Sequence, residues 1–203
     1  MTPAELADEI RQRAAGQGRF ITALAGPPGA GKSTLAAQVV VELGPGARLV
    51  PMDGFHYDNA VLDARGDRAR KGAPHTFDVG GLISLMARLR TGGEVAIPVF
   101  DRVADLARAA ADVVTDEDRL LVVEGNYLLL DAAPWNRLMP FFDLTVMISV
   151  PEAELERRLI RRWLDHGRTE VAARAWVASN DMPNVRTVIA GSRPADLVVD
   201  QGV

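Results

Sequence analysis

The sequence predicts an α/β fold in which a mainly parallel sheet is covered by helices on both faces. Short, almost continuous apolar segments alternate along the chain with stretches that carry apolar residues at helical spacing. Turns rich in glycine and proline separate these segments, and no repeat or linker divides them. A chain of 203 residues can bury a core of its own, so we expect one domain over residues 1–203.

The composition excludes several classes of protein. Hydrophobic residues make up 48% of the chain and charged residues 25%, which is a globular balance. The formal net charge of −4 gives no support for a nucleic-acid or anionic-membrane surface, and the absence of cysteine excludes disulfides and thiolate sites. The chain has no run of 18 apolar residues and no signal-peptide pattern, so we expect a cytoplasmic protein; a homodimer remains open.

The first elements follow from local signals. Thr2 and Glu5 have the spacing of a capping box, which predicts an amphipathic helix to about Ala15. The apolar run Phe20–Ala25 is bounded by glycines and predicts a buried strand. Lys32–Leu43 then carries apolar residues at helical spacing and is followed by a Gly-Pro stop.

The remaining elements continue the alternation. A second capping-box form at residues 149–152 predicts the start of a helix over 152–165, and another helix is expected over 80–90. Further buried strands are predicted at residues 47–52, 95–100, 120–123, 144–150 and 195–199.

The turn after the first strand has the pattern Gly-x-x-x-x-Gly-Lys-Ser. Between a strand and a helix, such a turn wraps backbone N–H groups around phosphate oxygens; its lysine reaches the β and γ phosphates, and its serine offers a hydroxyl to Mg²⁺. The sequence therefore predicts a site for a nucleoside triphosphate. Its residues are Gly26, Pro27, Pro28, Gly29, Ala30, Gly31, Lys32, Ser33 and Thr34.

Lysine usage singles out two positions. Of the 23 basic residues, only Lys32 and Lys71 are lysines. Because arginine supplies positive charge elsewhere, a chemical reason for an ammonium group is expected at both positions.

Two acids end predicted strands on the side where ligands gather in such sheets. Asp53 follows the second strand and is expected near the γ-phosphate, where it could accept a proton from a hydroxyl or hold Mg²⁺ through water. Glu124 ends another strand and fits a Mg²⁺ ligand, but it could also compete for the role of base. The polar Asn126 follows it and suits the same site.

Several arginines gather on the helix predicted over 152–165 and just beyond it. Glu154 and Arg158 form an i, i+4 pair, so part of this set is an ordinary solvated face. The segment could also swing guanidinium groups onto a transferring phosphate, and Arg162 and Arg168 are the favoured candidates.

These motifs resemble those of the phosphoribulokinase and uridine kinase group of P-loop kinases, and within it the bacterial pantothenate kinases. The chain is also similar to small bacterial proteins labelled as fructose-transport-system or nucleoside kinases. The resemblance covers most of the chain and rests on residues 26–34, 52–59, 70–78, 122–129, 161–167 and 180–184.

The resemblance implies a three-layer P-loop NTPase fold with a doubly wound sheet and a helical lid over about residues 155–180. It implies transfer of the γ-phosphate of ATP, with Mg²⁺, to an alcohol group of a small metabolite. Lys32, Asp53 and Arg162 would be catalytic, Asp53 as the base. Ser33 and Glu124 would hold the metal. Arg158, Arg168 and Asn184 would join the loop in binding nucleotide, with 180–184 beside the adenine. Residues expected to bind the acceptor are Asp53, His56, Tyr57, Arg70, Lys71, His75, Phe77, Asp101, Arg102 and Asn126.

Some features depart from the family pattern. Residues 100–102 lack the aromatic and histidine pattern around the acceptor of pantothenate kinases, and they suit an acceptor with several hydroxyls or an anionic group. The alternative is a regulatory ATPase or GTPase that hydrolyses its nucleotide, but neither lysine lies in a guanine-reading Asn/Thr-Lys-x-Asp motif. Tyr127, Trp135 and Trp163 are expected in the core.

Overall fold

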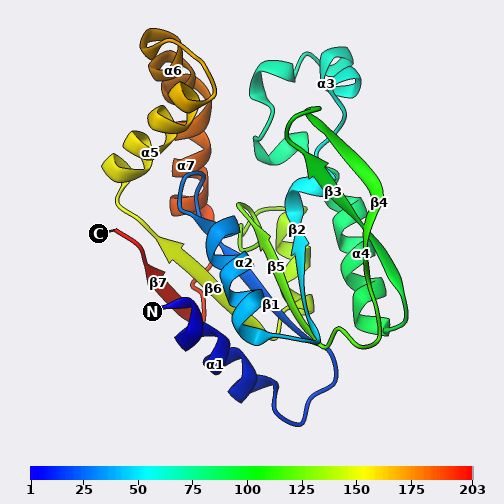
Figure 1. The fold of residues 1–203 in the computed structure, drawn as a ribbon. Helices are drawn as coiled ribbons and strands as arrows, with labels where there is room; N and C mark the ends of the chain where they lie inside the picture. The colour runs from blue at the N-terminus through cyan, green and yellow to red at the C-terminus, as the bar shows by residue number, and fades with distance from the viewer. Residues whose placement is uncertain (203) are drawn as a thin grey trace.

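A five-stranded parallel sheet forms the centre of the structure, a computed structural model that describes residues 1–202. All six residues of the central strand β1 are buried, which explains its unbroken apolar sequence. The carboxyl ends of the strands point toward the upper part of the molecule (Figure 1). The strands, in their order across the sheet, are β2 (Ala47–Pro51), β5 (Leu120–Gly125), β1 (Phe20–Ala25), β6 (Leu144–Ser149) and β7 (Leu197–Asp200).

Helices cover both faces of this sheet and confirm the predicted three layers. α1 (Pro3–Ala14) and α2 (Lys32–Leu43) pack against one face, together with the buried side of α5 (Glu152–Asp165). α4 (Val79–Thr91) and the 3₁₀ helix η4 (Trp135–Phe141) pack against the other face.

The helix starts show which local signals were decisive. α1 begins with the predicted capping box: the Glu5 N–H donates to Thr2 Oγ1 at 3.2 Å, and the Thr2 N–H donates to Glu5 Oε2 at 2.7 Å. The capping box predicted at residues 149–152 is wrong. Ser149 ends β6, and Pro151 precedes α5 without a side-chain cap, because the sheet pairing of β6 extends through Ser149.

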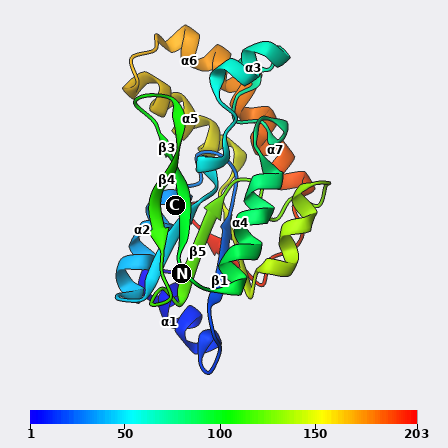
Figure 2. The same cartoon turned by 90° about the vertical axis from the view of Figure 1, so that its right-hand side faces the viewer.

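The strand predicted at residues 95–100 forms, but it lies outside the parallel sheet. β3 (Val95–Asp101) pairs antiparallel with β4 (Leu106–Val114) in a separate hairpin, which stands beside α4 (Figure 2). β4 escaped prediction because its alanine-rich sequence lacks strand propensity, and only pairing with β3 makes it extended.

Two groups of short elements rise above the carboxyl ends of the strands (Figure 1). One connects β2 to α4 and consists of η1 (Met52–Phe55), α3 (Asn59–Arg65), η2 (Arg68–Arg70) and η3 (Pro74–Thr76). The other continues from α5 through α6 (Glu170–Trp176), the π-helix η5 (Val177–Asp181) and α7 (Met182–Gly191), and it contains the expected lid residues.

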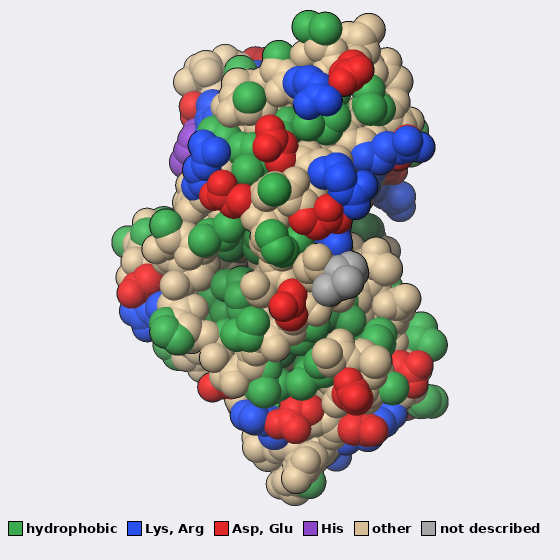
Figure 3. Space-filling model, turned by 90° about the vertical axis from the view of Figure 1, so that its left-hand side faces the viewer, with side chains coloured by type: hydrophobic (Ala, Val, Ile, Leu, Met, Phe, Trp, Pro, Cys, Tyr) green, Lys and Arg blue, Asp and Glu red, His purple; other side chains and the backbone are tan. Residues whose placement is uncertain are grey.

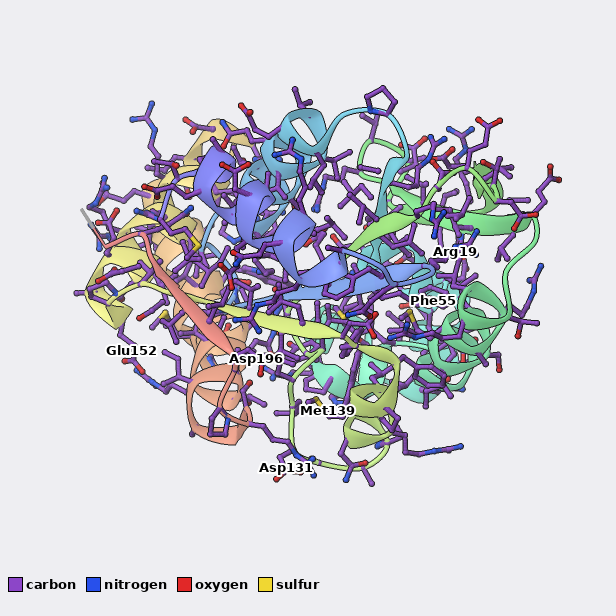
Figure 4. The ribbon with its side chains drawn as sticks, turned by 90° about the horizontal axis from the view of Figure 1, so that it is seen from below. Arg19, Phe55, Asp131, Met139, Glu152 and Asp196 are labelled. Atoms are coloured by element: carbon purple, nitrogen blue, oxygen red, sulfur yellow. The ribbon has the colours of Figure 1, made fainter. Side chains whose placement is uncertain are left out.

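The opposite end of the molecule is closed by structural hydrogen bonds. Arg19, just before β1, lies at this lower end (Figure 4). Its guanidinium donates to the backbone carbonyls of Asp118, Leu89 and Thr115 at 3.1, 2.9 and 2.6 Å. Arg19 thereby ties α4 and the β4–β5 connection to the sheet. Within residues 1–202, no helix is both long and apolar enough to cross a membrane.

Candidate active site

A cavity of about 690 Å³ opens where the strands end and the two groups of short elements face each other. Ligands of open α/β sheets gather at this edge. Most of the residues singled out from the sequence line it. They are Pro28, Gly29, Gly31, Lys32, Ser33, Thr34, Asp53, His56, Lys71, Phe77, Arg102, Glu124, Asn126, Arg158, Arg162, Arg168 and Asn184.

The phosphate loop has the left-handed backbone that its glycines permit. Gly29 and Gly31 have φ angles of +83° and +86°, which side chains with a Cβ rarely adopt. Gly26, Pro27 and Ala30 belong to the loop but lie outside the lining of this cavity. The loop thus joins β1 to α2 with its backbone curled, as a phosphate cradle requires.

Lys32 lies folded back over this loop. Its Nζ donates to the Pro27 carbonyl at 2.9 Å, and the residue is only 8% exposed. Burial lowers the pKa of Lys32 to about 8, although the carboxylates of Glu124 and Asp53 oppose the shift. A buried cation held by a single carbonyl is well placed to bind an incoming anion.

Ser33 and Glu124 form an oxygen-rich pair beside the loop. Ser33 Oγ donates to Glu124 Oε1 at 3.1 Å, and burial raises the pKa of the Glu124 carboxyl. Mg²⁺ prefers oxygen ligands and often takes only one or two from the protein, with substrate phosphates and water completing its shell. The hydroxyl and the carboxylate therefore fit Mg²⁺.

Asp53 lies in η1, just beyond β2. Its Oδ2 accepts from Arg102 of the β3–β4 turn at 2.7 Å. Its Oδ1 lies 3.9 Å from His56 Nε2. The carboxylate is therefore held through one oxygen by the hairpin, and it lies close enough to Glu124 for its charge to help raise the pKa of that carboxyl.

An aromatic wall surrounds His56. Its ring centroid lies 4.0 Å from that of Phe77 and 4.8 Å from that of Phe100. Burial between these rings lowers the pKa of His56 to about 4, so the imidazole is neutral at pH 7. Its Nδ1 is buried without a hydrogen-bond partner.

Lys71 joins the two segments that enclose this wall. Its Nζ donates to Asn59 Oδ1 at 2.7 Å, to Asp105 Oδ1 at 2.8 Å and to the Asp105 carbonyl at 3.0 Å. These three bonds use all three ammonium protons. Tyr127 holds the same segment from below, because its hydroxyl donates to the Gly72 carbonyl at 2.6 Å.

The segment expected to form the lid, residues 155–180, contributes arginines and tryptophans to the cavity lining. The Arg168 guanidinium lies 4.4 Å from the ring centroid of Trp163 and 4.5 Å from that of Trp176. Trp163 Nε1 donates to Asp181 Oδ2 at 2.6 Å. Burial lowers the pKa of Arg162.

The aromatic residues expected in the core divide into two groups. Tyr127 and Trp135 are fully buried, as predicted. Trp163 is partly buried: it packs against the core as predicted and also lines the cavity, where α5 turns it toward Arg168 and Asp181.

The segment 179–184 contacts residues 70 and 71, which were expected at the acceptor. Asn180 Nδ2 donates to the Lys71 carbonyl at 3.2 Å, and Arg70 donates to the Ser179 carbonyl at 2.8 Å and to Asn184 Oδ1 at 3.4 Å. Asn184 lines the cavity, whereas Arg70 lies behind the lining and connects the lid to this segment.

Three more residues expected at the acceptor lie outside the cavity lining. Asp101 accepts from the Val103 and Ala104 N–H groups at 3.1 and 3.0 Å, so it caps the hairpin turn. The Tyr57 ring stacks with a guanidinium from α3, and His75 is 54% exposed.

Some lining residues escaped the sequence analysis. Arg68 and Asp105 belong to no motif that distinguishes them from surface charges. Trp176 has the sequence context of an ordinary apolar helix residue. Asn180 and Asp181 belong to the motif at residues 180–184, but the sequence did not indicate an individual role for either residue.

A second hollow of about 360 Å³ lies on another side of the molecule. Its lining comes from residues 147–150 in and after β6, from residues 188–189 of α7, from residues 192–195 that follow α7, and from Val198 of β7. In the space-filling view, hydrophobic side chains gather on this face, below the upper part of the molecule (Figure 3). Pro27 of the phosphate loop reaches it from the site side.

A phosphate loop at the end of a central parallel strand, with an acid at the end of the edge strand β2, defines a P-loop kinase. The chain belongs to the phosphoribulokinase / uridine kinase family, whose family model matches residues 21–202. It is an ATP-dependent kinase that acts on a hydroxyl group of a small metabolite.

Individual relatives agree with this assignment. The chain is 34% identical to the Schizosaccharomyces pombe protein named "Putative uridine kinase C227.14", over 96% of this chain and 90% of that protein. It is 34% identical to the pantothenate kinase of Sorangium cellulosum, over 77% of this chain but only 54% of that kinase. The crystal structure of a "putative fructose transport system kinase" from Silicibacter sp. TM1040 is 45% identical, with a TM-score of 0.93, over 98% of this chain and 99% of that one.

Proposed function

We propose that this kinase binds ATP with Mg²⁺ over the phosphate loop and phosphorylates a hydroxyl group presented to Asp53. The observation that carries the proposal is the position of Asp53, whose carboxylate lines the same cavity as Lys32 and contacts acceptor-side residues. In-line transfer needs the attacking hydroxyl between the γ-phosphate and a proton acceptor.

Asp53 suits the role of base better than Glu124. Glu124 accepts from Ser33 of the nucleotide loop, and burial raises the pKa of its carboxyl. Asp53 faces Arg102 and His56, which lie on the acceptor side. Its Oδ1 is not taken by Arg102 and can receive the hydroxyl proton.

Ser33 and Glu124 would hold Mg²⁺. The ion would supply charge neutralisation for the β and γ phosphates. Lys32 would bind the same phosphates, and its ammonium would leave the Pro27 carbonyl for an anionic oxygen. Arg162 and Arg168 would add positive charge from the lid, with Arg158 and Asn184 beside the nucleotide.

The names of the relatives are consistent with a small hydroxyl-bearing acceptor. They include uridine and pantothenate kinases, so the family name alone does not select the acceptor. In this chain the acceptor would lie against His56, Phe77 and Asn126, with Arg102 beside the base.

The test is ADP release from Mg-ATP in the presence of a panel of pentoses, hexoses, polyols, nucleosides and pantothenate. The wild type should release ADP only with an acceptor. Asp53→Asn should bind ATP with nearly unchanged affinity and lose at least about 100-fold in kcat. Near-normal transfer by Asp53→Asn would exclude Asp53 as the base, and ADP release independent of every acceptor would favour a hydrolase.

A further inference from the structure

The acceptor side of the cavity is electrically balanced before any acceptor binds. Lys71 pairs with Asp105 at 2.8 Å, Arg102 with Asp53 at 2.7 Å, and Arg68 lies 3.3 Å from the carboxylate of Asp63. The ammonium of Lys71 also has no free proton, since Asn59 and the Asp105 carbonyl take the other two. An anionic acceptor would therefore meet cations that already have carboxylate partners.

The nucleotide side differs in this respect. Lys32, Arg162 and Arg168 line the cavity, and in the described part of the chain none of them has a carboxylate within 4.0 Å. These are the cations on which a triphosphate would be placed. The cavity-lining cations without a carboxylate partner are thus ones expected at the triphosphate, whereas Lys71, Arg102 and Arg68 are already paired.

The acceptor side instead has spare neutral hydrogen-bonding groups. Asn180 is 3% exposed and its Oδ1 has no partner, and the Nδ1 of His56 is likewise buried without one. Both residues line the cavity. Buried polar atoms without partners are rare in folded proteins because each costs desolvation energy, so a ligand or water hydroxyl is expected near them.

The wall behind these groups is aromatic. Phe77 and Phe100 flank the neutral imidazole of His56. Small-molecule sites combine such apolar walls with a few placed polar groups. A molecule with C–H faces and several hydroxyls meets both requirements.

We propose that the acceptor is an uncharged, polyhydroxylated molecule of sugar or polyol type, not a carboxylate or phosphate ester. One hydroxyl lies at Asp53, and the others contact Asn126, Asn180 and His56. This inference rests on the proposed function. In the transfer, the acceptor oxygen forms a bond to the γ-phosphorus of ATP as the bond to the β-γ bridging oxygen breaks, ADP leaves, and the hydroxyl proton passes to Asp53.

Matched pairs of acceptors that differ in charge test the proposal. The pairs are glycerol and D-glycerate, panthenol and pantothenate, ribitol and D-ribonate, and D-glucitol and D-gluconate, in which each acid keeps a primary hydroxyl of its neutral partner. In each pair that supports turnover, kcat/KM should be at least about tenfold higher for the neutral member. Preference for the anionic members would overturn the inference and leave the kinase intact. Failure of all eight to stimulate ADP release would overturn the proposed function as well.

A variant supplies an independent test. Asp105→Asn removes the carboxylate that neutralises Lys71, so the ratio of neutral to anionic kcat/KM should fall by about tenfold. Asp8→Asn, which frees Arg11 on α1 far from the cavity, is the matched control and should leave the ratio unchanged. Thermal unfolding identifies a misfolded Asp105 variant, and the ratio in the wild type then decides alone. An unchanged ratio in a folded Asp105→Asn protein would contradict the proposal.

Discussion

Lys32 shows how burial prepares a single residue for its ligand. Its ammonium is enclosed by the phosphate loop, and this burial lowers the pKa of Lys32. An anionic phosphate restores the preference for the charged form. The pH dependence of nucleotide binding should therefore report on this one side chain.

We predict that the affinity for Mg-ATP falls as the pH rises through about 8, the pKa of Lys32 in the free protein. Above that pH the free enzyme loses the proton that the bound phosphates require, so Kd should rise by up to about tenfold per pH unit. Calorimetric titration with a non-hydrolysable ATP analogue from pH 7.5 to 9.5 measures this change in Kd. Lys32→Ala should bind more weakly at every pH and show no such slope. A flat profile in the wild type would contradict the prediction.

At the scale of elements, a side-chain hydrogen bond joins two helices of the segment expected to form the lid. Trp163 of α5 donates to Asp181 of the π-helix η5 at 2.6 Å. Burial raises the pKa of Asp181, while this bond and the nearby Arg162 and Arg168 lower it. The bond therefore holds a desolvated acid and fixes α5 against the start of α7.

We predict a coupling of about 1.5–3 kcal/mol between Trp163 and Asp181, the range for hydrogen bonds to a charged group. Unfolding free energies of Trp163→Phe, Asp181→Asn and the double variant measure it. The control is Arg174 and Glu170 on α6, an ion pair at 2.8 Å whose side chains are 61% and 65% exposed, where no measurable coupling is expected. Equal coupling in both cycles would show that the lid bond adds nothing beyond a surface contact.

At the scale of the whole molecule, His56 makes the free energy of unfolding depend on pH below neutrality. In the folded protein its pKa is about 4, below the ordinary value of 6.5. As the pH falls below 6.5, the unfolded chain binds a proton that the folded chain excludes until about pH 4. The stabilisation is thus present above pH 6.5 and is lost between pH 6.5 and 4.

We predict that the wild type loses about 2 kcal/mol more unfolding free energy than His56→Gln between pH 7 and pH 5. Glutamine stays neutral throughout, so other titrating groups contribute equally to both proteins. Urea denaturation at the two pH values gives the comparison. Parallel losses in the two proteins would show that His56 is not held neutral by the fold.

Local sequence was sufficient for the framework of the fold and for the backbone geometry of the phosphate loop. α2 and α5 begin and end as predicted, and the capping box of α1 forms. The phosphate loop could also be predicted, because it consists of contiguous residues and includes glycines that adopt the left-handed conformation. Asp53 and Glu124 were found for a related reason: each follows an apolar strand whose end lies at the ligand edge.

The acceptor half was decided by tertiary structure. Lys71 and Asp105 are 34 positions apart and meet only because an alanine-rich segment pairs with β3 as a hairpin. Asp101 was expected at the acceptor but caps that hairpin turn. Trp163 packs against the core as expected, but the fold also brings it into the cavity lining. Composition and spacing by themselves determined that this chain binds a triphosphate on a parallel sheet. Which charges are already paired, and so which acceptor fits, depends on distances between segments that only the folded chain brings together.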